Sequence, residues 1–490
     1  MKFSGEQGES HDILLVISIS LATFMATLDG SIVNIALPTI SQSFNLSSGM
    51  VSWVSTIYLL VMAGCVLIFG KISDKIGYKR VFLTGFIIFT LGSLFCGVLP
   101  DITGSFLTLI GSRAFQGIGG AMISAVAPAM AIAFIPLEKK GRAMGIIMTF
   151  SALGTAIGPT IGGLLTEYLS WYFIFLINVP IGIFAVLLGA KIIPSIKPVQ
   201  DDSKFDKSGA ALIFVGLALL LFGVSEAQTL GWNSPAILVS LVAAVFILGY
   251  FILHELRSEN PVLDLRIFKD LQFLNMNIIL CLLFFSFSGV SYLLPFYLEY
   301  VKGYATADAG LILTSLSIAM MIAGILAGIL YDKIGGRRVT IIAAAILLVG
   351  YFLITHLTVD TTTSFIILCL GLMGFGLGML VTPISNMIMT SCSKRYEGMI
   401  SSLTCLERFA PLTLGIAFFN LSFIHGMISI AEAYGVTLQS PVLIQRKVLT
   451  AGFDLTFLVT FIIGIIIVVL TLLIRYRMHP DYENDDRSAR

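Results

Sequence analysis

The feature that most constrains this chain is a succession of long apolar runs that carry almost no charge. A helix that crosses a bilayer core needs about 20 apolar residues, and on that basis the sequence contains fourteen candidate spans. Transmembrane β-strands would instead give alternating segments of about ten residues. We therefore expect an all-α polytopic membrane protein. The expected spans are residues 13–37, 50–71, 79–99, 105–135, 141–166, 171–194, 208–226, 235–256, 272–300, 307–331, 337–357, 363–391, 398–425 and 450–476.

Composition indicates that lipid is the main solvent of this chain. Hydrophobic residues make up 57% of it and charged residues 12%, about half the charge of a typical soluble domain. No long basic stripe is present, so we expect no nucleic-acid partner. We find no HExxH, no paired-cysteine metal motif, no GxSxG and no Walker-type loop. We therefore expect no metal, no cofactor and no enzymatic activity.

Lysine and arginine are concentrated in alternate loops. Since cytoplasmic loops of membrane proteins carry the excess of these residues, we expect the basic loops and both termini to be cytoplasmic, in a cell (inner) membrane. The other loops hold only Lys302, Arg446 and Lys447. The basic loops hold Lys71, Lys75, Lys79, Arg80, Lys139, Lys140, Arg142, Lys197, Lys204, Lys207, Arg257, Arg266, Lys269, Lys333, Arg337, Arg338, Lys394 and Arg395.

A loop sequence occurs twice. GKISDKIGYKR (Gly70–Arg80) and GILYDKIGGRR (Gly328–Arg338) start 258 residues apart. Six spans with their loops need about 200 residues, so the excess indicates one inserted helical hairpin near residues 205–258. Parallel repeats of this kind place a substrate cavity between the two halves. The expected organisation is a six-helix bundle (1–198), an inserted transmembrane hairpin (199–260), a second six-helix bundle (261–478) and a polar cytoplasmic tail (479–490).

Several motifs carry a resemblance to a known family. Beside the repeated loop, the chain contains LDGSIVNIALP (Leu28–Pro38), LIGSRAFQGIGGA (Leu109–Ala121), GTAIGPTIGG (Gly154–Gly163) and FLINVPIG (Phe175–Gly182). In these motifs the chain resembles the fourteen-helix drug:proton antiporters of the major facilitator superfamily. The resemblance implies the major facilitator fold and export of small molecules by alternating access, driven by a proton gradient. The expected partners are a small-molecule substrate, protons and the bilayer, and we expect a monomer.

The repeated loop is a candidate gate. Asp74 at a tight turn can cap backbone N–H groups of the next helix and pair with Arg80. Gly70 allows close helix approach and Gly77 allows the turn. A pairing of this kind can hold one side of the protein shut and release it in another state; a static loop clamp is the alternative. The second copy of the loop provides Asp332 and Arg338.

Three charged residues within the expected spans are candidates for proton coupling, namely Asp29, Arg113 and Glu407. Charges inside a membrane are costly and usually face the protein interior with a partner. Asp29 is the first candidate for proton binding and Glu407 the second, while Arg113 fixes positive charge near a carboxylate. Each could instead be a structural hydrogen-bonding group. The candidates for substrate contact are Asp29, Asn34, Glu407, Glu226 and Glu299.

Glycines recur every four residues in the fifth expected span. Gly154, Gly158 and Gly162 share one helix face and would let a neighbouring helix come close, and Pro159 perturbs the helix there. We expect a close, bendable seam that prevents leakage while the halves rock.

The function that the resemblance implies, and that these residues support, is proton-coupled export of lipophilic or cationic small molecules, that is, multidrug efflux. One alternative is a proton-coupled transporter of another cargo, such as a metabolite, peptide, siderophore or lipid. A sensor or scaffold is disfavoured because it needs no titratable group in lipid.

Overall fold

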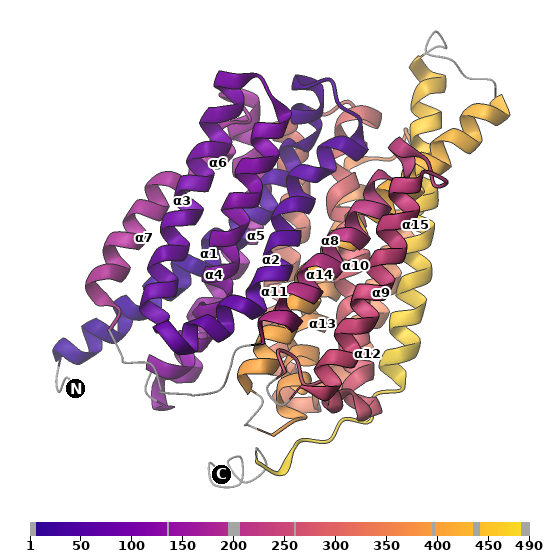
Figure 1. The fold of residues 1–490 in the computed structure, drawn as a ribbon. Helices are drawn as coiled ribbons and strands as arrows, with labels where there is room; N and C mark the ends of the chain where they lie inside the picture. The colour runs from indigo at the N-terminus through magenta and orange to yellow at the C-terminus, as the bar shows by residue number, and fades with distance from the viewer. Residues whose placement is uncertain are drawn as a thin grey trace.

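The computed structural model describes residues 6–134, 137–194, 206–258, 261–393, 397–434 and 442–481, and within them the regular structure is helical. Figure 1 shows long helices running side by side, with α1 beginning at the end of the bundle where the segment after α15 also lies. The elements are α1 (Glu6–Ser43), α2 (Ser48–Ile76), α3 (Tyr78–Thr103), α4 (Phe106–Phe134), α5 (Leu137–Tyr168), α6 (Phe173–Leu176), α7 (Asn178–Ile192), α8 (Lys207–Leu230), α9 (Pro235–Arg257), η1 (Leu265–Lys269), α10 (Leu271–Phe296), η2 (Tyr297–Val301), α11 (Thr306–Ile334), α12 (Gly336–Ile354), α13 (Thr363–Thr390), α14 (Glu397–Tyr434) and α15 (Val442–Leu472).

Twelve spans within the described residues are long and apolar enough to cross a membrane. They account for all the expected spans except 105–135 and 141–166, which the structure forms as α4 and α5, helices of 29 and 32 residues. The sixth expected span consists of α6 and α7, which follow one another directly. The boundary expected near residues 198–199 lies outside the described residues.

Large apolar side chains cover much of the outer surface. On α9, Val239, Val245 and Phe246 are 67%, 68% and 74% exposed. A soluble monomer rarely exposes contiguous apolar patches of this kind. Around a bundle of apolar helices, such a surface is compatible with lipid.

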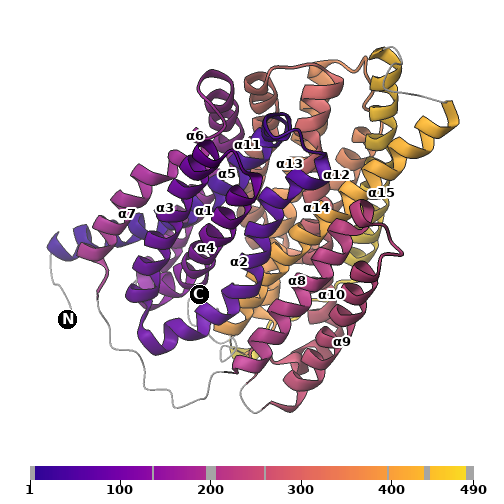
Figure 2. The ribbon, with the colours of Figure 1, turned by 45° about the horizontal axis from the view of Figure 1, so that its top comes forward.

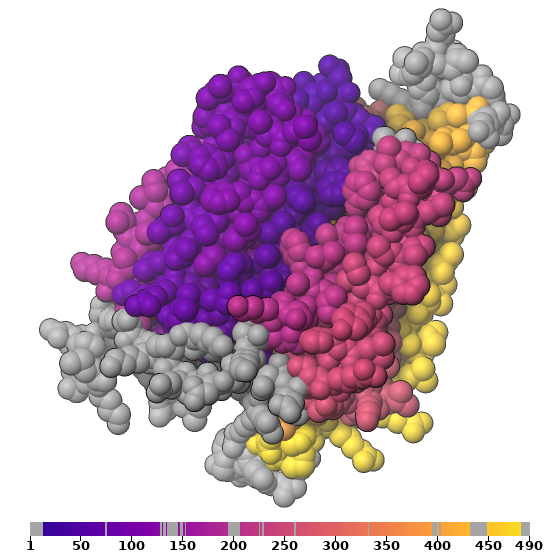
Figure 3. Space-filling view, in the orientation of Figure 1, coloured from indigo at the N-terminus to yellow at the C-terminus, as the bar shows by residue number. Residues whose placement is uncertain are grey.

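The helices pack as two groups with a pair beside them. In the N-terminal group (α1–α7), α1 packs on α5 and α3 on α4; in the C-terminal group (α10–α15), α11 and α12 pack on α13. The groups meet where α5 contacts α11 and where α2 contacts α14. Helices α8 and α9 pack on each other, and α8 also contacts α2 and α14. Figures 2 and 3 show this pair on the outside of the bundle.

The two copies of the repeated loop have the same backbone geometry. Gly77 joins α2 to α3 with a φ of 92°, and Gly335 joins α11 to α12 with a φ of 83°. Each donates its N–H to a carbonyl four residues back, Ser73 and Tyr331 respectively. Because L side chains rarely adopt such φ values, glycine is required at both turns, and the sequence repeat is a structural repeat.

Hydrogen bonds join the two helix groups near one end of the bundle. We call the end with the repeated loops the basic face and the opposite end the distal face. At the distal face Thr306 N–H donates to Glu167 Oε2 over 3.2 Å, and Tyr300 Oη donates to the Pro38 carbonyl, also over 3.2 Å. Nearer the middle, the hydroxyls of Thr160 and Thr314 lie 2.6 Å apart. The groups are therefore held together at the distal face.

Candidate functional site

A buried ion pair lies inside the N-terminal group. Arg113 on α4 donates from Nη1 to Asp29 Oδ2 on α1 over 2.8 Å, and the two side chains are 1% and 0% exposed. The sequence singled out both residues as charges within apolar runs, and the structure brings them together. A carboxylate and a guanidinium compensate each other's charge in an interior where either alone would be costly.

The pair belongs to a larger polar network that joins five helices. Gln116 accepts from Arg113 Nη1 at 2.6 Å and donates to Asp29 Oδ1 at 2.9 Å and to Ser93 Oγ on α3 at 2.8 Å. Asn178 on α7 donates to Asp29 Oδ1 over 3.1 Å. Arg113 Nε donates to the Val54 carbonyl on α2 over 3.0 Å. The hydrogen bonds of the Asp29–Arg113 pair and of Gln116 thus connect α1, α2, α3, α4 and α7.

Two aromatic rings enclose the guanidinium. Arg113 Cζ lies 4.1 Å from the centre of the Tyr58 ring and 5.4 Å from that of Phe175. A cation over an aromatic face is stabilised by the ring quadrupole, more strongly where water is excluded. The rings therefore help to keep the arginine charged and fixed in position.

Gln116 and Asn178 were not singled out from the sequence. Both lie within quoted motifs, and Gln116 is three residues after Arg113, on the same helix face. A charged residue within a span needs polar neighbours on the same face, and that rule would have selected Gln116. Nothing in the spacing of Asn178, 149 residues after Asp29, indicates that the two meet.

Glu407 on α14 is a second buried carboxylate. It is 6% exposed, and its Oε2 has no hydrogen-bond partner among the described residues. The next residue, Arg408, points elsewhere: its Cζ lies 5.8 Å from the Phe284 ring centre and 6.0 Å from that of Phe409. Among the residues that the structure describes, Glu407 therefore lacks the arginine partner that Asp29 has.

The remaining substrate candidates lie in three different places. Asn34 donates to Ser291 Oγ on α10 over 3.0 Å and accepts from Ser55 over 3.2 Å, beside a small cavity between α1, α5, α10 and α11. Glu226 on α8 accepts from Trp53 Nε1 on α2 over 2.7 Å and so ties two helices together. Glu299 lies in η2 near the distal face, and its Oε1 has no partner among the described residues.

The expected glycine seam packs α5 against α1. A methyl group added at Gly154 would lie 2.6 Å from the Phe24 carbonyl oxygen, and one at Gly162 would lie 2.8 Å from the Ile32 carbonyl oxygen. Gly158 faces Ser31 in the same way. Pro159, in the same stretch, presents its carbonyl to Gly310 of α11. One helix thus contacts both groups at close range.

The expected gates are described only in part. The side chains of Asp74 and Asp332 lie outside the described residues. Gly70 is in the last two turns of α2, and the side chains of Arg80 and Arg338 are exposed. Within the described residues, no three His, Cys, Asp or Glu side chains form a group that could hold a metal ion.

An apolar outer surface around charges held in the interior defines a multi-pass membrane protein. Comparison with known proteins identifies the family: the chain belongs to the Major Facilitator Superfamily, whose model matches residues 19–406. It is therefore a membrane transporter rather than an enzyme.

Curated relatives and a solved structure agree with this assignment. The chain is 34% identical over 416 residues to the riboflavin transporter RibZ of Clostridioides difficile, covering 84% of this chain and 89% of that protein. It is 33% identical over 406 residues to the multidrug resistance protein Stp of Mycobacterium tuberculosis, covering 83% and 74%. A bacterial homologue of the human lysosomal transporter Spinster, solved in an inward-facing and unoccupied conformation, shares the fold with a TM-score of 0.67 at 14% identity, over 95% of this chain and 97% of that one.

Proposed function

We propose that this protein is a secondary active transporter that exports lipophilic or cationic small molecules in exchange for protons, by alternating access. The buried Asp29–Arg113 pair, 2.8 Å apart and shielded from water, carries the proposal. A buried ion pair at this depth has no role in a scaffold, whereas in a transporter it can switch the protein between two states. Multidrug resistance proteins among the relatives support this choice of cargo.

The mechanism follows from the five-helix network. Protonation of Asp29 removes the negative charge that compensates Arg113 and weakens the hydrogen bonds that Asp29 Oδ1 accepts from Gln116 and Asn178. The helices held by those bonds then favour a different packing. A proton drives transport only if it changes the relative stability of the two states, and the proposal assigns that change to this network.

Glu407 is proposed as the second site. A buried carboxylate with one unpartnered oxygen is stabilised by binding either a proton or a cationic group. Its place on α14, in the C-terminal group, would let cargo or a proton act on that group while Asp29 acts on the other. Asn34, Glu226 and Glu299 are proposed as secondary substrate contacts.

We also propose the full topology. Helices α4 and α5 complete fourteen spans, and α8 with α9 forms a hairpin inserted between six-helix bundles at 1–198 and 261–478. The basic loops, both termini and the tail 479–490 face the cytoplasm by the distribution of lysine and arginine, in the inner membrane, with a monomer as the working unit. The two glycine turns at Gly77 and Gly335, which have matching φ values, support a pair of cytoplasmic gates that include Asp74, Arg80, Asp332 and Arg338.

A metabolite is the second candidate cargo. The relative named as a riboflavin transporter covers most of this chain. The cavity between α1, α5, α10 and α11 is lined by uncharged polar groups, among them Asn34, Ser291 and Ser317, together with apolar side chains. Hydrogen-bonding groups without charge suit a neutral, polar cargo as well as a drug.

Transport by the purified protein in vesicles tests the coupling. A pH gradient is imposed, and efflux of a lipophilic cation, a neutral drug and riboflavin is measured for the native protein and for Asp29→Asn. We expect the native rate to follow the gradient and the Asp29→Asn rate to be independent of it. Which of the three compounds moves decides between the cargo classes.

A second variant controls for folding, because Asp29→Asn leaves Arg113 buried without a counter-charge, which typically costs about 3–5 kcal/mol. Asp29→Asn/Arg113→Gln removes both charges and should recover much of that stability. It should remain uncoupled. Transport that still follows the pH gradient in either folded variant would refute the role of Asp29.

A further inference from the structure

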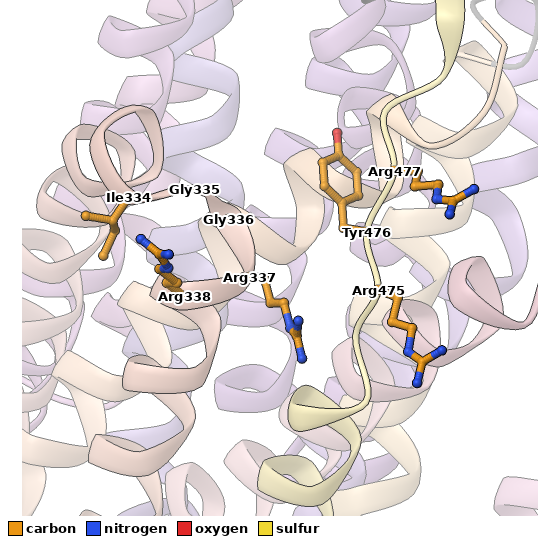
Figure 4. A pocket seen from close by; sticks show the side chains of 8 residues that line it. All are labelled: Ile334, Gly335, Gly336, Arg337, Arg338, Arg475, Tyr476 and Arg477. Atoms are coloured by element: carbon orange, nitrogen blue, oxygen red, sulfur yellow. The ribbon is translucent and has the colours of Figure 1, made fainter.

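Four arginines line a groove on the basic face. The groove measures about 560 Å³ and lies between the turn that joins α11 to α12 and the segment that follows α15. Figure 4 shows Arg337 and Arg338 in the first turn of α12 on one side, and Arg475 and Arg477 on the extended segment on the other. All four side chains are exposed. Segments about 140 residues apart in sequence thus each contribute two arginines to the lining of one groove.

Within the described residues, acidic side chains do not balance the positive charges of this groove. Among the described residues no carboxylate forms an ion pair with any of the four arginines. The first turn of α12 adds to the positive potential, because its N-cap residue, Gly335, provides no side-chain cap and helix N-termini attract anions. Arginine keeps its charge at any physiological pH and suits phosphate geometry. The chemistry of the groove therefore suits an anion.

Polar contacts hold the walls of the groove in place. Arg337 Nη2 donates to the Leu472 carbonyl over 3.2 Å, and Arg475 N–H donates to Gln272 Oε1 over 2.6 Å. The hydroxyls of Tyr476 and Thr390 lie 2.6 Å apart. The first contact joins α12 to the end of α15, and the other two fix the extended segment against α10 and α13. The arginines stand on a fixed surface rather than on a free tail.

An apolar flank continues from the groove along the same helices. Ile342 on α12 is 44% exposed, and Val469 and Leu472 on α15 are each 50% exposed; Leu473, just after α15, is 59% exposed. Helices α12 and α15 pack on each other. A free phosphate would make no contact with such a flank, whereas the acyl chains of a lipid would lie along it. Basic pockets between transmembrane helices suit the head groups of anionic lipids.

We propose that this groove binds the phosphate head group of an anionic phospholipid from the leaflet on the basic face, with its acyl chains along α12 and α15. The site lies outside the Asp29–Arg113 network and the cavity beside Asn34, and it shares one residue, Arg338, with the proposed gate. It adds a lipid ligand to the C-terminal group, at the turn that repeats the loop between α2 and α3.

Binding of defined lipids tests the proposal. The full-length protein is freed of lipid in detergent, and the affinities for phosphatidylglycerol and for phosphatidylcholine with the same acyl chains are measured by native mass spectrometry. The variant is Arg338→Gln/Arg475→Gln/Arg477→Gln, which keeps Arg337 and its bond to Leu472. Since each basic residue near a membrane surface contributes appreciably to anionic-lipid binding, we expect the variant to bind phosphatidylglycerol at least about tenfold more weakly.

A matched variant removes the same charge elsewhere on the basic face. Lys191, Arg257 and Lys269 are exposed, and Lys191→Gln/Arg257→Gln/Lys269→Gln should bind phosphatidylglycerol as the native protein does. Thermal unfolding without lipid checks that each variant folds. If the arginine variant does not fold, Arg475→Gln/Arg477→Gln takes its place, because both residues lie outside the helices.

Three results would overturn the proposal. The first is equal affinity of the native protein for the two lipids, and the second is equal loss in the matched variant. In the third, inorganic phosphate or glycerol phosphate displaces phosphatidylglycerol completely at the concentrations at which the lipid binds, which would make a soluble anion the occupant. Phosphatidylglycerol binding that resists both competitors and is lost only in the arginine variant would support the lipid.

Discussion

At the scale of single residues, two buried acids have different surroundings. Asp29 accepts three hydrogen bonds and pairs with an arginine, whereas Glu407 has one oxygen with no partner among the described residues. A paired carboxylate is stable in its charged form, and an unpaired one needs a proton or a cation from elsewhere. In the proposed transport cycle, the two acids would therefore act at different steps.

Substitution of Glu407 tests this difference. Glu407→Gln keeps the shape of the side chain and removes its capacity for negative charge. We expect binding of a lipophilic cation to weaken about tenfold or more, since hydrogen bonds to charged groups are the stronger ones, while binding of a neutral drug changes little. Fluorescence or calorimetric titration of the purified protein gives both affinities. Glu226→Gln, at the acid bonded to Trp53, is the control. Equal weakening of binding for the two cargoes would show that Glu407 does not distinguish a cationic cargo from a neutral one.

The sequence predicts single residues of the site better than their contacts. Asp29 and Arg113 stand out because charge is rare in apolar runs, and that rule requires no three-dimensional knowledge. Their contact depends on the tertiary structure and cannot be predicted from the sequence, because 84 residues separate them. The position of Glu226 could not be predicted at all. Whether it faces water or Trp53 depends on how α8 is rotated against α2.

At the scale of helices, glycine sets the closest approaches. The face with Gly154, Gly158 and Gly162 was predicted from its period of four, and in the structure a helix packs against it. The sequence could not say which helix. It is α1, which carries Asp29. The seam therefore positions the backbone on which the proposed proton site is built.

Filling this seam should weaken the fold. In Gly154→Ala the new methyl group would crowd the Phe24 carbonyl oxygen, so α1 and α5 must separate. We expect a loss of about 1–3 kcal/mol, the usual cost of overpacking, measured by thermal unfolding in detergent. Gly371→Ala is the control, because nothing lies within 4 Å of a methyl group there. A Gly154→Ala protein as stable as the control would mean that the seam can open without cost.

At the scale of the whole molecule, the two helix groups are joined at the distal face. Gly310 of α11 lies against the Pro159 carbonyl of α5, and Gly163 of α5 lies against Thr306 and Ala307. The pattern of apolar runs and the repeated loop predicted two related groups of helices. It could not predict which face is closed, because a transporter sequence is compatible with more than one state.

Crowding this junction should shift the balance between states. Gly310→Ala would place a methyl group into the Pro159 carbonyl, which disfavours closure at the distal face. The test uses a Ser291→Cys variant, with the new thiol beside the cavity, in a protein from which the six native cysteines have been removed. Its reaction with a membrane-impermeant thiol reagent added from the distal side should become several-fold faster. Gly324→Ala, where a methyl group makes only ordinary contact, should leave the rate unchanged, and an unchanged rate for Gly310→Ala would contradict this view of the junction.

The contacts of α8 bear on how the whole assembly could move. The Phe214 ring of α8 fills the space beside Gly64 on α2, and Glu226 bonds to Trp53 on the same helix. Towards α14, by contrast, α8 meets Cys405 and Leu406 through apolar contacts, which have no preferred direction. If the two groups rock, α8 and α9 should move together with α2 and slide along the surface of α14. The pair would then act as a sliding cover over one side of the junction, while the opposite side, between α5 and α11, has no such cover among the described helices.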